Sequence, residues 1–181
     1  MRTEKMLTSA QIIRKRRLAA ETRQGYISLI IRVLVIAVIG WLLFTQVFFI
    51  GQAKGNDMFP AVKDGDLVIG FRLQKNYIKD DVIVYEVDGE LHVGRILGRE
   101  SDVITMDDSG TLLVNGTVQG GEILFPTYAK EGIEYPYTVP EGSVFVLGDY
   151  RTQAEDSRDF GCISLEDVKA KVITIIRRRE I

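Results

Sequence analysis

Three short segments of the chain bring together glycine, proline and charged side chains in a way that a plain β-domain does not require. The first is Gly55–Pro60 (GNDMFP) and the second is Gly94–Gly98 (GRILG). The third joins Leu147–Arg151 (LGDYR) to Asp156–Gly161 (DSRDFG). The carboxylates in these segments could do acid–base chemistry. The structural alternatives are a turn, a strand with a bulge glycine and a loop with ion pairs.

Asp57, in the first segment, has two kinds of candidate partner for acid–base chemistry. His92 lies just before the second segment, on the same face of the expected strand, and a base there could activate water. A second carboxylate, Asp149 or Asp156, could instead complete an aspartic dyad with Asp57. The structural interpretation is favoured: we expect His92 to be a half-exposed strand residue and Asp156 to pair with Arg158 or another arginine.

The counts of cysteine and histidine exclude several kinds of site. The single cysteine, Cys162, rules out an internal disulfide framework and a four-cysteine metal site, and the single histidine rules out a two-histidine zinc site. We therefore expect no metal and no cofactor. Cys162 is expected to be a small buried residue, with an intermolecular disulfide outside the cell as the alternative.

An uncharged apolar stretch, Val33–Ile50, precedes all three segments. As a helix it would span about 27 Å, close to the hydrocarbon thickness of a bilayer. Aromatic side chains cover several of its sides and it has no polar face, which argues against a buried core helix. The exit from the stretch shows no clean small-x-small cleavage site, so we interpret it as an uncleaved signal anchor.

The distribution of charge predicts the orientation of this anchor. Residues 1–25 carry seven basic and two acidic side chains, and positive flanks stay in the cytoplasm. We expect a cytoplasmic basic tail at 1–25, a transmembrane signal anchor at 26–50 and an extracellular domain at 51–181. The protein would then be a single-pass component of the cell membrane.

The domain after the anchor is predicted to be mainly β, either a barrel or two packed sheets. Asp88-Gly89 and Asn115-Gly116 are strong hairpin signals between short β-branched runs. A turn near Pro60–Lys63 and a helix at Ser164–Lys169, capped by Ser164, are weaker expectations. The predicted strands are Asp66–Phe71, Asp81–Val87, Leu91–Leu97, Asp102–Met106, Thr111–Val114, Ser143–Leu147 and Val172–Arg177.

With an anchor followed by these three segments, the chain resembles the bacterial type I signal peptidases, which are membrane-anchored serine proteases. The resemblance covers nearly the whole chain. The first box of that family, of the type Ser-Met-x-Pro, is matched by Met58 and Pro60. The second, of the type Lys-Arg-Val-x-Gly, is matched by Arg95 and Gly98. The third, of the type Gly-Asp-Asn-x-x-x-Ser-x-Asp-Ser-Arg, implies structural roles for Gly148, Asp149, Arg151, Asp156, Ser157, Arg158 and Gly161.

The resemblance fails at the catalytic dyad. Asp57 stands where the family has its nucleophilic serine, and Gly94 stands where the family has its general-base lysine. Tyr150 and Ala154 replace an asparagine and a serine of the third box. A carboxylate has no hydroxyl with which to form an acyl-enzyme, and glycine has no side chain to accept a proton. We therefore expect no catalytic residue here, with an active signal peptidase of atypical chemistry as the alternative.

Asp and Gly at the dyad positions make the chain similar to the SipA-type signal peptidase-like proteins of Gram-positive streptococci, which are encoded with pilus components. The resemblance implies a non-catalytic chaperone that assists pilin polymerisation together with a class C sortase. The implied partners are pilin subunits or their signal and N-terminal segments, the pilus sortase and the membrane, and no nucleic acid.

The family resemblance also implies a retained groove, in which a peptide binds as an added strand between the first segment and the strand at Asp81–Tyr85. Since Gly94 has no side chain, we expect a water-filled space opposite Asp57, whose carboxylate would be partly solvated and ionised. The candidate peptide-binding residues are Gly55, Met58, Pro60, Asp81, Ile83 and Tyr85.

Overall fold

The computed structural model describes residues 9–120 and 125–177, which fall into two compact units that divide between Thr45 and Gln46. The first unit consists of the helix α1, which runs from Ser9 to Val47 and so extends just past the division. Its segment Thr22–Val47 is apolar and long enough to cross a membrane. The apolar side chains of this segment are exposed, with Trp41 at 68%. Such a surface fits a lipid environment and contradicts a buried core helix.

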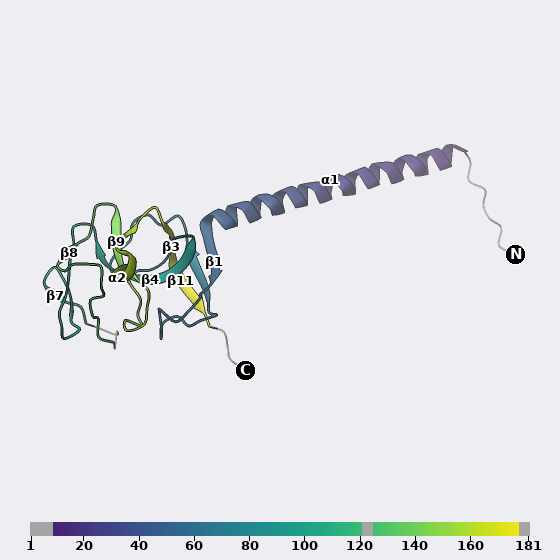
Figure 1. Ribbon diagram of the computed structural model, residues 1–181. Coiled ribbons are helices and arrows are strands. Elements are labelled where there is room, and N and C mark those ends of the chain that lie inside the picture. Colours follow the sequence, from purple (N-terminus) through teal and green to yellow (C-terminus); the bar gives the residue numbers. More distant parts are fainter. Residues whose placement is uncertain (1–8, 121–124, 178–181) are drawn as a thin grey trace. The chain divides into compact units, whose positions relative to one another are not determined.

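The second unit contains two antiparallel sheets, whose strands are seen in Figure 1. The seven-stranded sheet has the order β1-β2-β11-β3-β4-β9-β10, and the four-stranded sheet has the order β7-β6-β5-β8. The mainly β prediction is confirmed. The strands are β1 (Phe48–Gln52), β2 (Leu67–Phe71), β3 (Val82–Val87), β4 (Glu90–Arg99), β5 (Val103–Met106), β6 (Leu112–Val114), β7 (Thr117–Val118), β8 (Tyr137–Thr138), β9 (Ser143–Leu147), β10 (Ile163–Ser164) and β11 (Val168–Ile176).

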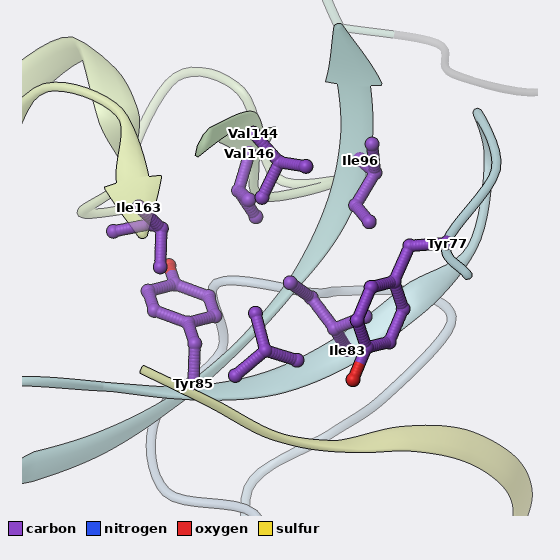
Figure 2. Packing of buried hydrophobic residues seen from close by; sticks show 8 residues of the cluster. Tyr77, Ile83, Tyr85, Ile96, Val144, Val146 and Ile163 are labelled. Carbon is purple, nitrogen blue, oxygen red and sulfur yellow. The ribbon is translucent and has the colours of Figure 1, made fainter. Parts of the chain in front are cut away.

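Strand β3 lies inside the larger sheet and buries both of its faces. Ile83 and Tyr85 point into one apolar cluster, shown in Figure 2, where Ile96 and Val146 also lie. Val84, on the opposite face, belongs to a second cluster that underlies the segment after β1. The alternation follows from the two-residue period of a strand, and it makes β3 a rigid support for whatever lies on either side.

Three local predictions differ from the structure. The helix expected at Ser164–Lys169 is wrong, because Ser164 ends β10 and Val168 already begins β11. A short helix, α2 (Ser157–Phe160), was not predicted and is closed by a capping box in which Asp156 is the N-cap. The apolar stretch does not remain helical to Ile50, since Phe48 begins β1 and pairs with Phe71.

Candidate functional site

The segment that contains Asp57 forms a turn, as expected near Pro60–Lys63. Hydrogen bonds and buried side chains fix this turn in place. The Gly55 N–H donates to the Asp64 carboxylate at 2.9 Å, and the Val62 N–H donates to the Met58 carbonyl at 2.8 Å. Met58 and Val62 are buried in the cluster below. A positive φ of 75° at Gly55 lets the chain enter this turn without strain. The turn therefore presents Asp57 from a fixed backbone.

The Asp57 backbone packs directly against the third segment. Its carbonyl accepts a hydrogen bond from the Tyr150 N–H at 2.8 Å. A Cβ atom at Gly148 would lie 2.5 Å from the same carbonyl oxygen and 2.3 Å from the Ala154 side chain, so only glycine fits there. The first and third segments, predicted from their motifs alone, are thus brought into contact.

The Asp57 carboxyl group is half-buried, and its pKa is raised above the ordinary value. Burial is the main cause, because desolvation disfavours the charged form. The negative charges of Glu155 and Asp156 act in the same direction, while a hydrogen bond from the Glu155 backbone and the nearby His92 lower the pKa. The half-buried position agrees with the expected partly solvated carboxylate, and burial makes its charged form less favourable than in water.

Gly94 lies on β4, and the space beside it is filled. An added Cβ would lie 2.4 Å from Cγ1 of Val146 and 3.1 Å from the ring of Tyr85. The expectation of an empty, water-filled floor at this position is therefore wrong, since two apolar side chains close it. A side chain at position 94 requires Val146 to move.

His92 is part of an aromatic group that covers this floor. Its ring stacks on Tyr85 at a centroid distance of 5.6 Å and an interplanar angle of 20°, and it meets Phe160 at 5.8 Å. His92 is half-buried, which agrees with its interpretation as a half-exposed strand residue. The imidazole ring therefore lies among aromatic rings and near Asp57.

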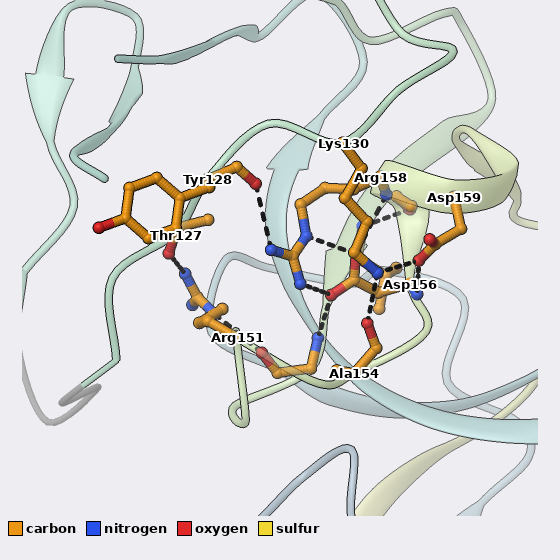
Figure 3. A network of polar contacts seen from close by, with 11 residues as sticks. Thr127, Tyr128, Lys130, Arg151, Ala154, Asp156, Arg158 and Asp159 are labelled. Atoms are coloured by element: carbon orange, nitrogen blue, oxygen red, sulfur yellow. Dashed lines mark hydrogen bonds and ion pairs between the residues drawn. The ribbon is translucent and has the colours of Figure 1, made fainter. Parts of the chain in front are cut away.

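The remaining matched aspartates are committed to buried ion pairs. Asp149 accepts two hydrogen bonds from Arg95, at 2.8 and 2.7 Å. Asp156 accepts two from the Arg158 guanidinium, both at 2.8 Å, as Figure 3 shows, and two from the backbone N–H groups of Arg158 and Gly148, both at 3.1 Å. The prediction that Asp156 pairs with Arg158 or another arginine is confirmed. With these oxygens occupied, neither aspartate offers a free carboxylate for a dyad with Asp57.

The third segment is locked onto the larger sheet by the same network. The Ser157 hydroxyl accepts a hydrogen bond from the Val146 N–H at 2.9 Å, and the α2 helix begins at this residue. Gly161 closes the helix with a φ of 83° and donates its N–H to the Ser157 carbonyl. These contacts support the structural roles that the resemblance implies for Ser157 and Gly161.

A groove of about 320 Å³ lies beside the Asp57 turn. The end of β1 and the residues after it form one wall, and the tip of the β3–β4 hairpin forms the other. A smaller hollow, lined by Asp57 and Met58, shares Ala53, Lys54 and Val93 with this groove. Leu91, which is 49% exposed, gives the wall formed by the β3–β4 hairpin an apolar surface.

The structure shifts the position at which a peptide strand could add. Strand β3, with the candidate residues Ile83 and Tyr85, pairs with β4 on one side and β11 on the other, so it has no free edge there. Asp81 is bound to Lys171 at 2.7 Å. On β4, pairing with β9 begins only at Arg95, so among the described residues the part of β4 before it pairs with β3 alone. Peptide binding by the six candidates remains a prediction.

Several residues at the site were not found from the sequence. Glu155 reaches Asp57 because the loop after Arg151 folds back, and no local pattern signals that return. Lys130 ties the same loop to α2 by donating to the Ala154 carbonyl and the Asp159 carboxylate (Figure 3). The capping box of α2, with Asp156 followed three residues later by Asp159, is the one signal that could have been recognised.

Comparison with known proteins gives a consistent result. The family model described as "Signal peptidase, peptidase S26" matches residues 24–176. Signal peptidase I of Bacillus caldolyticus is 30% identical over 135 residues, which cover 66% of this chain and 74% of that protein. Signal peptidase IB of Staphylococcus aureus is 27% identical over 157 residues, covering 71% and 81%.

Two further matches cover the chains less evenly. The probable thylakoidal processing peptidase 2 of Arabidopsis thaliana is 31% identical over 127 residues, and the match covers 61% of this chain and 33% of the plant protein. The chain therefore spans about a third of that relative. The crystal structure of a signal peptidase I from Enterococcus faecalis shows 27% identity and a TM-score of 0.46, covering 55% of this chain and 97% of that one.

Proposed function

Because the chain belongs to the peptidase S26 family of signal peptidases, we propose that it is a non-catalytic member that binds an extended peptide and assists pilin polymerisation. The observation that carries the proposal is the pair of substitutions at the dyad positions. Asp57 supplies a carboxylate in place of a hydroxyl, and Gly94 supplies no base. Both changes lie in a fold whose supporting ion pairs are intact.

The packing around Gly94 supports the loss of catalysis. Val146 and Tyr85 close the position from which a lysine would have to reach the nucleophile. A deprotonated amine at position 94 would need space and a fixed geometry. A nucleophile and a base act as a unit, so removing either one removes most of the rate acceleration. The site is therefore built as an apolar floor under a carboxylate.

The groove beside Asp57 supports the binding of a peptide. The wall formed by the β3–β4 hairpin contains the part of β4 before Arg95, which pairs with β3 alone. The backbone groups on the opposite edge of this part of β4 can therefore form hydrogen bonds with an added strand. The base of the groove is the apolar cluster that contains Met58 and Val84. Such a groove favours an extended segment with apolar side chains at alternate positions.

The assignment of the partner to pilin comes from the similarity to the SipA-type proteins at Asp57 and Gly94. In the proposed arrangement, α1 anchors the protein, the β domain lies outside the cell, and the groove holds a signal or N-terminal segment of a pilin while a class C sortase joins the subunits. The partners are thus pilin, the sortase and the membrane.

Complementation of a deletion strain tests the proposal. Asp57→Ala is expected to restore pilus polymerisation, because no reaction depends on the carboxylate. Leu91→Asp is expected to abolish it by placing a charge in the groove wall. Val118→Asp, at another exposed apolar side chain, on β7 outside the groove, should leave it intact. Loss of polymerisation with Asp57→Ala, or equal effects of the two aspartate substitutions, would contradict the proposal.

A second candidate function has one observation in its favour. The raised pKa of Asp57, next to the charges of Glu155 and His92, is the environment that prepares a carboxyl group for acid–base catalysis. On this reading the chain is a signal peptidase with atypical chemistry that activates water. It predicts cleavage of a preprotein that is lost in both Asp57→Ala and His92→Ala, whereas the binding function predicts no cleavage in any variant.

A further inference from the structure

Arg151 is a buried cation without a carboxylate partner among the described residues. It is 4% exposed, and its guanidinium donates from Nε to the Gly148 carbonyl at 2.8 Å and from Nη1 to the Thr127 hydroxyl at 2.7 Å, the second of which is drawn in Figure 3. Both acceptors are neutral. No carboxylate of the described chain lies within ion-pair distance of this guanidinium.

The surrounding charges do not balance. Arg95 pairs with Asp149 and Arg158 with Asp156, so Arg151 is attracted by these two carboxylates but has no ion-pair partner of its own among the described residues. Burial lowers the pKa of Arg151 to about 10, and the guanidinium therefore remains charged at neutral pH. A buried charge without a counter-ion is costly, and a mobile anion would offset that cost.

A cavity of about 420 Å³ opens beside this guanidinium. Arg95, Lys79 and Asp80 also line it. Since Asp149 pairs with Arg95, the cations of Arg151 and Lys79 stand against the carboxylate of Asp80 among the lining residues. Thr111 and Thr127 supply hydroxyl groups, and Leu97 and Leu112 form an apolar part of the wall. The cavity lies outside the groove next to Asp57, with which it shares no lining residue.

We propose that this cavity is a binding site for an oxyanion, a phosphate or carboxylate group, whose oxygens accept hydrogen bonds from Arg151. The planar guanidinium fork matches the geometry of both groups, and the hydroxyl side chains of the wall can complete the oxygen shell. The mixed lining fits a small molecule or chain end that carries the anion on an apolar body. The inference stands independently of the peptide groove and of pilin.

Thermal unfolding of the full chain in a maltoside detergent, which contains no phosphate, tests the site. Inorganic phosphate and, in a separate arm, sodium acetate are titrated at constant ionic strength set with sodium chloride. Saturable stabilisation is expected for at least one of them, and the stronger of the two identifies the anion class. Stabilisation no greater than with chloride alone would overturn the proposal.

Three variants make the test specific. Arg151→Gln is expected to weaken anion binding about tenfold or more, the scale of a lost charge-assisted hydrogen bond. Arg99→Gln removes one exposed arginine outside the cavity and should leave the binding unchanged. Thr127→Val keeps the side-chain shape but removes a wall hydroxyl and an Arg151 acceptor, so the binding is expected to change less than in Arg151→Gln. A loss as large as that of Arg151→Gln would contradict the role of the guanidinium. Equal weakening by the two glutamine variants would contradict the site.

The wild-type protein provides a readout that does not depend on the folding of a variant. The arginine Nε–Hε resonances are followed by NMR during the same titration, and the Arg151 resonance is expected to shift and saturate with the concentration dependence of the thermal stabilisation. An Arg151 resonance that stays in place while phosphate and acetate are added would refute the inference even if Arg151→Gln does not fold.

Discussion

At the scale of single residues, the departures from the signal peptidase pattern are accommodated by their surroundings. Asp57 sits on a turn fixed to Tyr150 and Gly148, and Gly94 is covered by Val146 and Tyr85. Position 57 therefore presents a carboxylate and position 94 a filled space, so the pair offers no hydroxyl and no amine.

The carboxyl group of Asp57 should make folding stability depend on pH. Since burial raises its folded-state pKa above the unfolded value, the ionised group destabilises the fold once the pH exceeds both values. Asp57→Asn should therefore raise the melting temperature at neutral pH, and the gain should vanish as the pH falls below the ordinary value of 3.8. Melting curves across this range check the prediction, with the exposed Asp108→Asn as the control. A variant that is less stable at neutral pH would contradict it.

The filled space at Gly94 should resist a side chain. Gly94→Lys is expected to lower the free energy of unfolding by about 1–3 kcal/mol, because the new Cβ overlaps Val146. Gly120→Lys, where an added Cβ meets no atom within 4 Å, is the matched control. Chemical unfolding of Gly94→Lys with and without Val146→Ala should reveal favourable coupling between the two changes. Additive effects would show that the overlap does not matter.

At the scale of elements, the site depends on one irregular loop held by buried ion pairs. The chain between β9 and β10 folds through Asp149, Arg151, Asp156 and Arg158, all of which are buried, and this loop carries Glu155 to Asp57. The hydrogen bonds between paired strands do not determine the conformation of such a loop. Its conformation depends on the ion pairs and hydrogen bonds that its buried charged side chains form.

Breaking one of these buried pairs should therefore be far more damaging than breaking a pair at the surface. Arg158→Met leaves Asp156 charged and buried, which should cost about 3–5 kcal/mol of unfolding free energy. Lys169→Met, which removes the more exposed pair with Glu86, should cost less than about 1 kcal/mol. Denaturant titrations of both variants measure the difference, and comparable losses would argue against this role for the network.

The elements that follow a simple period were predictable, and those that depend on distant contacts were not. Alternating β-branched residues gave β2, β3 and β9, and Asp88-Gly89 gave the hairpin between β3 and β4. The run that begins at Ser164 has a helix-capping pattern, but Ser164 pairs with Ser143 and Val168 with Tyr85, so both of its ends are strands. The motifs located Asp57 and Gly94, whereas the packing that closes Gly94 depends on Val146, which no spacing rule connects to it.

At the scale of the whole molecule, the chain combines an exposed apolar helix with a β domain that has its own cores. The positive residues before the helix predict that this end stays in the cytoplasm. Protease added to intact protoplasts should then digest the β domain and leave the N-terminal segment protected. Protection of residues 54–181 under the same conditions, with digestion after lysis, would reverse the orientation.

In the proposed function, the chain keeps a signal peptidase scaffold that binds peptide without cleaving it. The most direct measurement incubates the full chain in detergent with a preprotein bearing a signal peptide, and follows both binding and cleavage, the latter by mass spectrometry of the products. We expect saturable binding that Leu91→Asp weakens and Val118→Asp does not, with the preprotein intact throughout. Cleavage at a defined bond by the wild-type chain, abolished by Asp57→Ala with the fold preserved, would contradict it.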